Sequence, residues 1–172
     1  MSEGQGTIAI FPGTFDPVTC GHLDIIERGR RLFSKLIIGV GRNPEKTQLF
    51  TPEERVAMIR PLVAHMPNVS VQSYDGLTAD FVRQMGAHVI LRGVRDFIDL
   101  RNELQQASTN LIVGGIETVF ILTSHEHALT SSTLIKQIVE MGGGDPSRLS
   151  HIVPPPVIER LREKLRQQNG GP

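Results

Sequence analysis

A run of residues that includes glycines, threonines and a histidine follows the first apolar segment of the chain. Residues 7–11, Thr-Ile-Ala-Ile-Phe, lead into Pro12-Gly13-Thr14-Phe15-Asp16-Pro17-Val18-Thr19-Cys20-Gly21-His22. Gly13 and Gly21 permit close backbone approach, and His22 stands in the first turn of an expected helix. The unpaired N–H groups and the dipole of a helix N-terminus attract anions. The run therefore predicts a phosphate site, although His22 alone could be a polar cap of its helix.

Cationic and hydroxyl side chains recur after later apolar runs. Lys46 lies in the loop 42–50, Arg92 and Arg95 flank Gly93 after the run 88–91, and Thr130-Ser131-Ser132-Thr133 opens a further helix. Lys46 alone could be a solvated surface charge, and the hydroxyl cluster alone could be a plain N-cap. In open parallel sheets, however, ligands bind beyond the carboxyl ends of the strands. We therefore expect these groups to share one positive pocket.

Short Ile- and Val-rich runs alternate with helical patterns, and this alternation predicts the elements that would position these side chains. We expect strands at 7–11, 35–41, 69–73, 88–91 and 117–122, and helices at 21–33, 51–64, 78–85, 96–111, 131–141 and 155–168. The order indicates an α/β fold: a Rossmann-like, doubly wound, five-stranded parallel sheet with helices on both faces. We expect a single domain, 1–172, with a C-terminal helical appendage from about residue 150. The stripe of Phe97, Leu100, Leu104, Ala107 and Leu111 predicts an amphipathic helix whose apolar face is core.

Composition excludes several classes of protein. The chain holds 18 basic and 18 acidic residues, so its formal net charge is zero and a nucleic-acid partner is not expected. No apolar run approaches the roughly 18 residues of a membrane span, so we expect no membrane partner. Cys20 is the single cysteine, which excludes an internal disulfide and fits a cytoplasmic protein.

The motifs resemble those of a known family. Gly13-Thr14-Phe15-Asp16-Pro17 with Thr19-x-Gly21-His22 is similar to the signature of the nucleotidyltransferase superfamily, and the threonine variant is similar to that of the bacterial phosphopantetheine adenylyltransferases. Phe50-Thr51-Pro52-Glu53-Glu54-Arg55, Leu91-Arg92-Gly93-Val94-Arg95 and Ser131-Ser132-Thr133 continue the resemblance in order. It spans roughly residues 7–140.

The resemblance implies transfer of AMP from ATP to 4′-phosphopantetheine, which gives dephospho-coenzyme A and pyrophosphate. It implies that His22 stabilises the transition state and that Glu103, otherwise a solvated helix-face residue, lies in the nucleotide site. The implied phosphopantetheine-binding residues are Thr14, Lys46, Thr78 and Arg92. The implied ATP-binding residues are Thr14, Phe15, His22, Gly93, Val94, Arg95, Glu103, His127, Ala128, Leu129, Thr130, Ser131, Ser132 and Thr133.

The implied nucleophile is a phosphate that is largely dianionic at neutral pH, so the reaction needs no general base. We expect Mg²⁺ to arrive with ATP, without a metal site built by the protein. The resemblance also implies a homo-oligomer, a hexamer. Three positions depart from the family: Thr78 replaces an apolar residue, His127 replaces an aromatic ring near the adenine, and Asp96–Arg101 differs in pattern.

Two other functions stay open at this point. A sister transferase would act on nicotinate mononucleotide or use a cytidylyl donor, but such enzymes usually carry histidine where Thr19 stands. A catalytically silent nucleotide-binding module would not need to retain His22.

Overall fold

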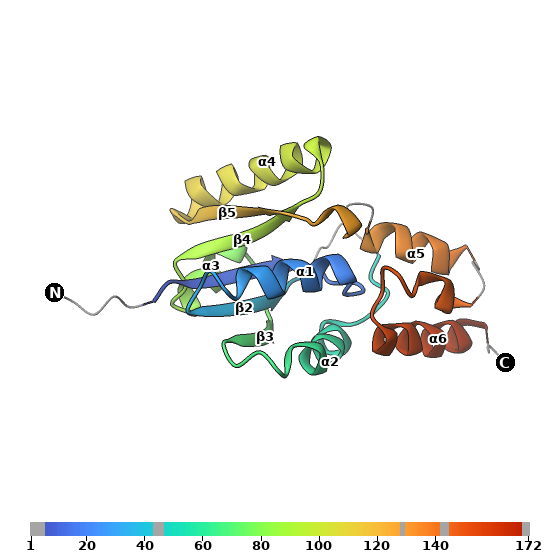
Figure 1. Cartoon of the computed structure of the whole chain (residues 1–172). Helices are drawn as coiled ribbons and strands as arrows, with labels where there is room; N and C mark the ends of the chain where they lie inside the picture. The colour runs from blue at the N-terminus through green and yellow to red at the C-terminus, as the bar shows by residue number, and fades with distance from the viewer. Residues whose placement is uncertain (1–5, 43–46, 128–129, 142–144, 170–172) are drawn as a thin grey trace.

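A five-stranded parallel sheet forms the centre of the molecule (Figure 1). The computed structural model describes residues 6–42, 47–127, 130–141 and 145–169. The strands are β1 (Ile8–Gly13), β2 (Lys35–Val40), β3 (Val69–Ser73), β4 (Val89–Val94) and β5 (Glu117–Leu122). They lie in the order β3-β2-β1-β4-β5, and every pair is parallel. The predicted fold class is therefore confirmed.

Helices cover both faces of the sheet because successive strand residues point to opposite sides. Helices α1 (Cys20–Gly29) and α2 (Pro52–Val63) pack on the face that carries Ala9 and Phe11. Helix α3 (Thr78–Gln84) packs on the opposite face, with Ile10 and Ile90, and contacts α4 (Phe97–Gly114). This is the doubly wound arrangement that an alternation of strands and helices favours.

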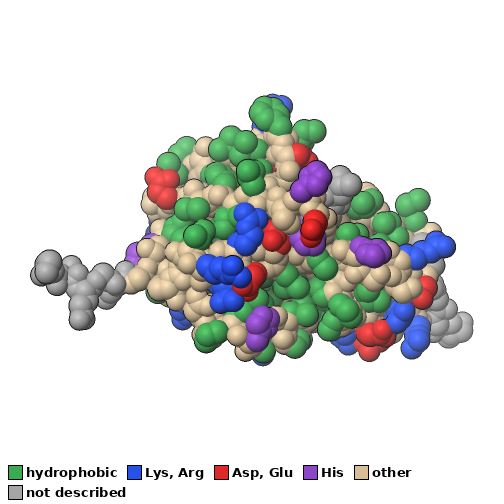
Figure 2. Space-filling view, viewed as in Figure 1, with side chains coloured by type: hydrophobic (Ala, Val, Ile, Leu, Met, Phe, Trp, Pro, Cys, Tyr) green, Lys and Arg blue, Asp and Glu red, His purple; other side chains and the backbone are tan. Residues whose placement is uncertain are grey.

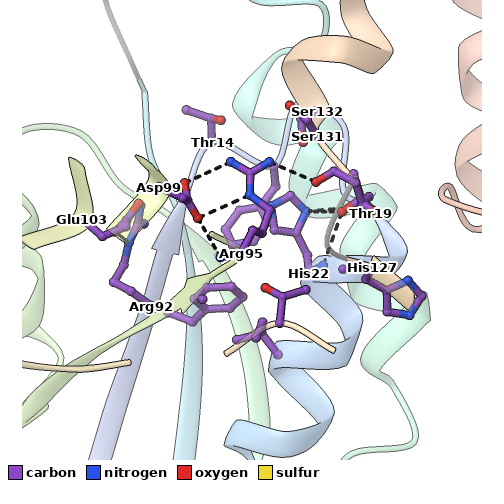
Figure 3. Close-up of a pocket in the computed structure, with 18 of the residues that line it drawn as sticks. Thr14, Thr19, His22, Arg92, Arg95, Asp99, Glu103, His127, Ser131 and Ser132 are labelled. Carbon is purple, nitrogen blue, oxygen red and sulfur yellow. Dashed lines mark hydrogen bonds and ion pairs between the residues drawn. The ribbon is translucent and has the colours of Figure 1, made fainter. Parts of the chain in front are cut away.

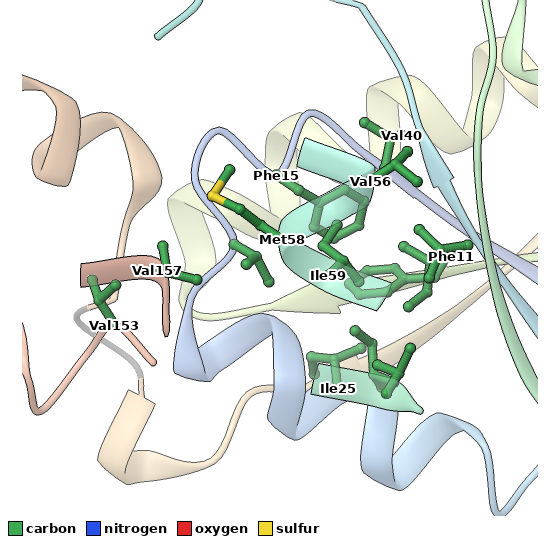
Figure 4. Close-up of a cluster of buried hydrophobic side chains, with 14 of the residues drawn as sticks. Phe11, Phe15, Ile25, Val40, Val56, Met58, Ile59, Val153 and Val157 are labelled. Atoms are coloured by element: carbon green, nitrogen blue, oxygen red, sulfur yellow. The ribbon is translucent and has the colours of Figure 1, made fainter. Parts of the chain in front are cut away.

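The remaining helices lie beyond the carboxyl ends of the strands (Figure 1). These are α5 (Ser132–Glu140) and α6 (Pro155–Asn169), with short 3₁₀ turns at His125–His127 and Pro146–Leu149. Val157 and Leu161 of α6 are fully buried and belong to the same apolar cluster as Phe15, Ile25 and Ile59 (Figure 4). The C-terminal helix thus packs against the end of the sheet where β1 leads into α1.

Helix α4 contradicts the predicted apolar packing. Phe97, Leu104 and Leu111 are 81%, 48% and 45% exposed, whereas Glu103 of the same helix is buried. The reason is that α4 turns its Asp99 and Glu103 face toward the arginines at the end of β4, with which both carboxylates pair. The apolar stripe therefore faces outward.

Several element boundaries also differ from prediction; α4, for example, continues to Gly114 rather than ending at residue 111. Strand β4 runs on to Val94, because Arg92 and Gly93 pair with Phe120 and Ile121 of β5. Arg92 and Gly93 therefore lie within the strand rather than after it. Helix α1 ends at Gly29 instead of continuing to residue 33. Among the described residues, no helix combines the length and apolar character needed to cross a membrane.

Candidate active site

A cavity opens at the carboxyl ends of β1 and β4, beside the N-termini of α1 and α5 (Figure 3). The walls come from the Gly13–Phe15 loop, from β4 and from α4. They are lined by Phe11, Pro12, Gly13, Thr14, Phe15, Thr19, Gly21, His22, Ile25, Arg92, Gly93, Arg95, Asp99, Glu103, Thr123, His127, Thr130, Ser131, Ser132 and Thr133. The cavity is where ligands bind in open α/β sheets, near the point at which the strand order reverses.

His22 both caps helix α1 and faces the cavity. The Thr19 N–H donates to His22 Nδ1 at 3.1 Å, and the His22 N–H donates to Thr19 Oγ1 at 3.3 Å, which together form a capping box. The imidazole and the Phe15 ring pack in a T-shaped arrangement, with ring centroids 4.9 Å apart. Helix capping and a role in the site are therefore compatible for this residue.

The surroundings of His22 keep its ring neutral. Burial, together with the positive charges of Arg92 and Arg95, lowers the pKa of His22 from 6.5 to about 3. Because Nδ1 accepts the Thr19 N–H, it carries no proton, and the neutral ring must hold its proton on Nε2. Among the described residues, Nε2 has no hydrogen-bond partner, so it is available as a donor in the cavity.

Arg92 extends from β4 to the α4 side of the cavity. Its Nε and Nη2 donate to Glu103 at 2.5 and 2.6 Å, and its Nη1 donates to the Pro12 carbonyl at 2.5 Å. The Glu103 side chain is 9% exposed and that of Arg92 is 22% exposed. This bidentate pair fixes the guanidinium plane at the edge of the cavity, and within the described part of the chain two of its five N–H groups have no acceptor.

Arg95 connects three segments around the cavity. Its guanidinium donates to Asp99 on α4, with a shortest distance of 3.0 Å, and to the carbonyl of Thr130 before α5 at 3.1 Å. The ion pair lowers the pKa of Asp99 in spite of its burial and raises the pKa of Arg95. Both groups are therefore charged at neutral pH. Arg95 therefore links the residue that precedes α5, Thr130, to helix α4.

Hydroxyl groups surround the N-terminus of α5. Ser131 is its N-cap and accepts from the Leu134 N–H at 3.4 Å, while Ser132 donates to the Pro17 carbonyl at 2.9 Å. Nearby, Thr130 Oγ1 and His127 Nδ1 are buried and have no hydrogen-bond partner among the residues that the structure describes. Two helix N-termini, those of α1 and α5, therefore meet at the cavity.

A second cavity adjoins the first on the side of β2 and α3. It includes Gly41, Arg42, Tyr74 and Thr78, whose hydroxyl lies 2.9 Å from that of Tyr74. Its remaining lining comes from Asn102, Gln106, Ala107, Asn110 and Thr118. The two cavities share Pro12, Gly13, Thr14, Arg92, Arg95, Asp99 and Glu103. A molecule in each would therefore meet at Thr14 and Arg92.

Most of the residues expected from sequence converge on these cavities. Those in the first cavity are Thr14, Phe15, His22, Arg92, Gly93, Arg95, Glu103, His127, Thr130, Ser131, Ser132 and Thr133. Thr78 lines the second cavity, whereas Val94 lines neither. Lys46, Ala128 and Leu129 lie outside the described residues.

Asp99 and Tyr74 were not predicted, although both line the cavities. The signal for Asp99 was its position four residues after Arg95, at the start of a helix. Tyr74 directly follows β3, which is the usual place for a ligand-contacting residue in this fold. No group of three or more His, Cys, Asp or Glu side chains suited to a metal ion is found in the described part of the chain.

Sequence comparison relates the chain to nucleotide-transferring enzymes. Residues 10–138 match the profile of the family described as Cytidylyltransferase-like. A phosphopantetheine adenylyltransferase from Synechococcus sp. (strain JA-3-3Ab) is 52% identical over 159 residues, which cover 92% of this chain and 98% of that protein. The enzyme of the same name from Rhodopirellula baltica is 45% identical over 160 residues, 92% of this chain and 89% of its own length.

Solved structures share the fold at low sequence identity. A putative nicotinate-nucleotide adenylyltransferase from Vibrio parahaemolyticus superposes with a TM-score of 0.58 at 17% identity, covering 91% of this chain and 98% of its own. A bifunctional NMN adenylyltransferase/ADP ribose pyrophosphatase from Francisella tularensis has a TM-score of 0.60 at 17% identity, covering 80% of this chain and 43% of its own. These similarities establish the architecture alone.

Proposed function

We propose that the two adjoining cavities hold the two substrates of adenylyl transfer from ATP to 4′-phosphopantetheine. The chain belongs to the phosphopantetheine adenylyltransferase family, which is named for this reaction. ATP would occupy the first cavity, and 4′-phosphopantetheine would occupy the second, its phosphate directed at Thr14 and Arg92. The wall that the two cavities share supports this assignment of the substrates. Its hydrogen-bond donors, Thr14 and Arg92, would bring the phosphates of the two substrates together. The products are dephospho-coenzyme A and pyrophosphate.

The chemistry is an in-line displacement at the α-phosphorus of ATP. An oxygen of the phosphopantetheine phosphate forms the new P–O bond, and the bond to the pyrophosphate oxygen breaks. The nucleophile is already largely dianionic at neutral pH, so no protein group has to remove a proton. The protein's task is to align two anions and to offset their repulsion.

In this proposal the neutral His22 donates its Nε2–H to a non-bridging oxygen of the α-phosphate. The charge on that oxygen grows in the transition state, so a donor fixed in place by the capping box stabilises it without rearranging. Arg92 and Arg95 lie close enough to depress the pKa of His22 and would place positive charge beside the same phosphates. Removal of one such donor typically costs a factor of about 10² to 10³ in rate.

We expect Mg²⁺ to enter as part of the nucleotide substrate. The carboxylates that line the first cavity, Asp99 and Glu103, are both engaged by arginines. An ion coordinated by the phosphates would keep several waters, as Mg²⁺ commonly does. The residues present thus fit a metal–nucleotide complex better than a metal held by side chains alone.

We also propose that the outward-facing side of α4 and the edge strand β5 form a contact between copies, in a hexamer. Ile98, Ile112 and Leu122 are 74%, 84% and 71% exposed, and green side chains gather over α4 at the top of the molecule in Figure 2. Contiguous apolar surface of this kind marks interaction sites. Light scattering after gel filtration would test this: we expect six copies, dissociated by Ile112→Glu, and a monomeric wild-type chain would refute it.

The decisive test of function mixes the purified protein with Mg-ATP and one acceptor at a time, and measures the release of pyrophosphate. We expect pyrophosphate release and dephospho-coenzyme A with 4′-phosphopantetheine, and background release with nicotinate mononucleotide. CTP replaces ATP in a parallel reaction to test a cytidylyl donor. Turnover of nicotinate mononucleotide, or of CTP in preference to ATP, would assign the chain to a sister reaction, and no turnover with any pair would point to a silent binding module.

A further inference from the structure

Arg55 of helix α2 is fully buried and lines neither cavity. Its Nη1 donates to the carbonyl of Thr14 at 2.6 Å and to the carbonyl of Gly41 at 3.0 Å. Its Nε donates to the Thr51 carbonyl at 3.3 Å, and its Nη2 donates to Gln48 Oε1 at 3.1 Å. One guanidinium therefore joins the loop after β1, the end of β2 and the start of α2.

The contact with Thr14 sets the orientation of the peptide between Thr14 and Phe15. The peptide unit is planar and trans, so its C=O and N–H point in opposite directions. With the Thr14 carbonyl turned toward Arg55, the Phe15 N–H points away from it. Within the described residues, this N–H has no acceptor, and Phe15 lines the first cavity. The amide is thus left free for a ligand oxygen.

This peptide orientation has to be held in place. Phe15 has a φ of 49°, in the left-handed region that costs a non-glycine residue about 1–2 kcal/mol. Phe15 is 1% exposed, and its ring packs on Phe11 and His22. The next residue, Asp16, accepts the N–H groups of Leu49 and Phe50, both at 2.9 Å. Those contacts fix the residues after the peptide, whereas Arg55 acts on the peptide's own carbonyl.

We propose that Arg55 is a positioning residue that presents the Phe15 amide to the phosphates of the nucleotide. The inference rests on the proposed function only in taking the first cavity as the nucleotide site. When Arg55 is removed, the Thr14 carbonyl loses its donor, and the peptide is free to rotate toward a φ without the left-handed cost. The phosphates then lose one amide donor, whereas the nucleoside part of the ligand loses nothing.

The test compares Arg55→Met and Arg55→Lys with the control Gln48→Ala, which removes a different partner of the same guanidinium. Calorimetry measures the affinity and the stoichiometry of each protein for ATP and for adenosine. For Arg55→Met we expect about tenfold weaker binding of ATP, the effect of one lost hydrogen bond to a charged group, with adenosine unchanged. Lysine can still donate to the Thr14 carbonyl, so Arg55→Lys should recover part of the loss. Gln48→Ala should bind both ligands as wild type does.

Equal losses for ATP and adenosine, or an unchanged ATP affinity in Arg55→Met, would overturn the inference. If Arg55→Met does not fold, the same selective loss in the folded fraction of Arg55→Lys decides the question, because the fitted stoichiometry separates unfolded protein from weakened binding. A wild-type chain that binds ATP but does not transfer its adenylyl group to 4′-phosphopantetheine would refute the proposed function and leave the role of Arg55 standing.

Discussion

The depressed pKa of His22 makes a prediction about stability against pH that needs no substrate. Its pKa is 6.5 in the unfolded chain and about 3 in the folded protein. Between these values the unfolded state binds more protons, so the free energy of unfolding falls as the pH falls. The contribution of His22 is fully present above pH 6.5 and is lost progressively toward pH 3.

The size of the effect follows from the linkage relation. A single group with these two pKa values destabilises the fold by about 3 kcal/mol between pH 7 and pH 4. Water that reaches the ring through the cavity reduces this figure, so we expect about 2 kcal/mol to be measured. Arg95, which faces His22 and whose pKa is raised by its hydrogen bonds to Asp99, stays charged throughout this range and adds no slope of its own.

The assay is urea denaturation of the wild-type chain and of His22→Asn at pH 7, 6, 5 and 4. The Asn Oδ1 can accept the Thr19 N–H as Nδ1 does, so the helix cap is retained while the titrating group is removed. We expect the wild type to lose about 2 kcal/mol more than the variant from pH 7 to pH 4. Two parallel curves would refute the claim that the folded protein holds His22 neutral.

Three further predictions concern the charges around the site. Glu103→Gln should lower the free energy of unfolding by about 2 kcal/mol, because it leaves the Arg92 guanidinium without its carboxylate, and equal urea midpoints would contradict this. Lys136→Met should lower the free energy of unfolding by about 1–2 kcal/mol, because it removes the cation 3.4 Å from the buried Asp16. The control Lys164→Met, which removes a more exposed cation, should lower it by less than about 1 kcal/mol. Similar losses of stability in the two variants would argue against a special role for Asp16. The value of kcat/KM for 4′-phosphopantetheine should fall below about pH 6 as the substrate phosphate gains its second proton, and a protein group titrating between pH 6 and 8 would count against a reaction without a general base.

The alternation of apolar strands and helices predicted the fold, because each buried strand shows its own hydrophobic pattern. The helix expected at 51–64 likewise begins where predicted, because Thr51 and Glu54 form a capping box at the start of α2. Such features depend on residues close together in the chain, so their outcome can be read from the sequence.

The ion pairs were harder to foresee because they depend on how elements meet. Arg92 and Glu103 are eleven residues apart in the chain, and their contact depends on how α4 packs beside β4. The same pairing turns the apolar stripe of α4 outward, where periodicity alone predicts burial. The contact between Arg55 and Thr14 spans 41 positions, and the sequence motif that contains Arg55 carries no indication of its partner.

The rate of pyrophosphate release by His22→Asn, with saturating Mg-ATP and 4′-phosphopantetheine, tests most directly whether His22 stabilises the transition state of adenylyl transfer. Binding of ATP is measured alongside. We predict a kcat lower by a factor of about 10² to 10³, with the Kd of ATP changed by less than about threefold. A variant that retains the wild-type kcat, or one whose kcat and ATP affinity fall by the same factor, would contradict a role of His22 in the transition state.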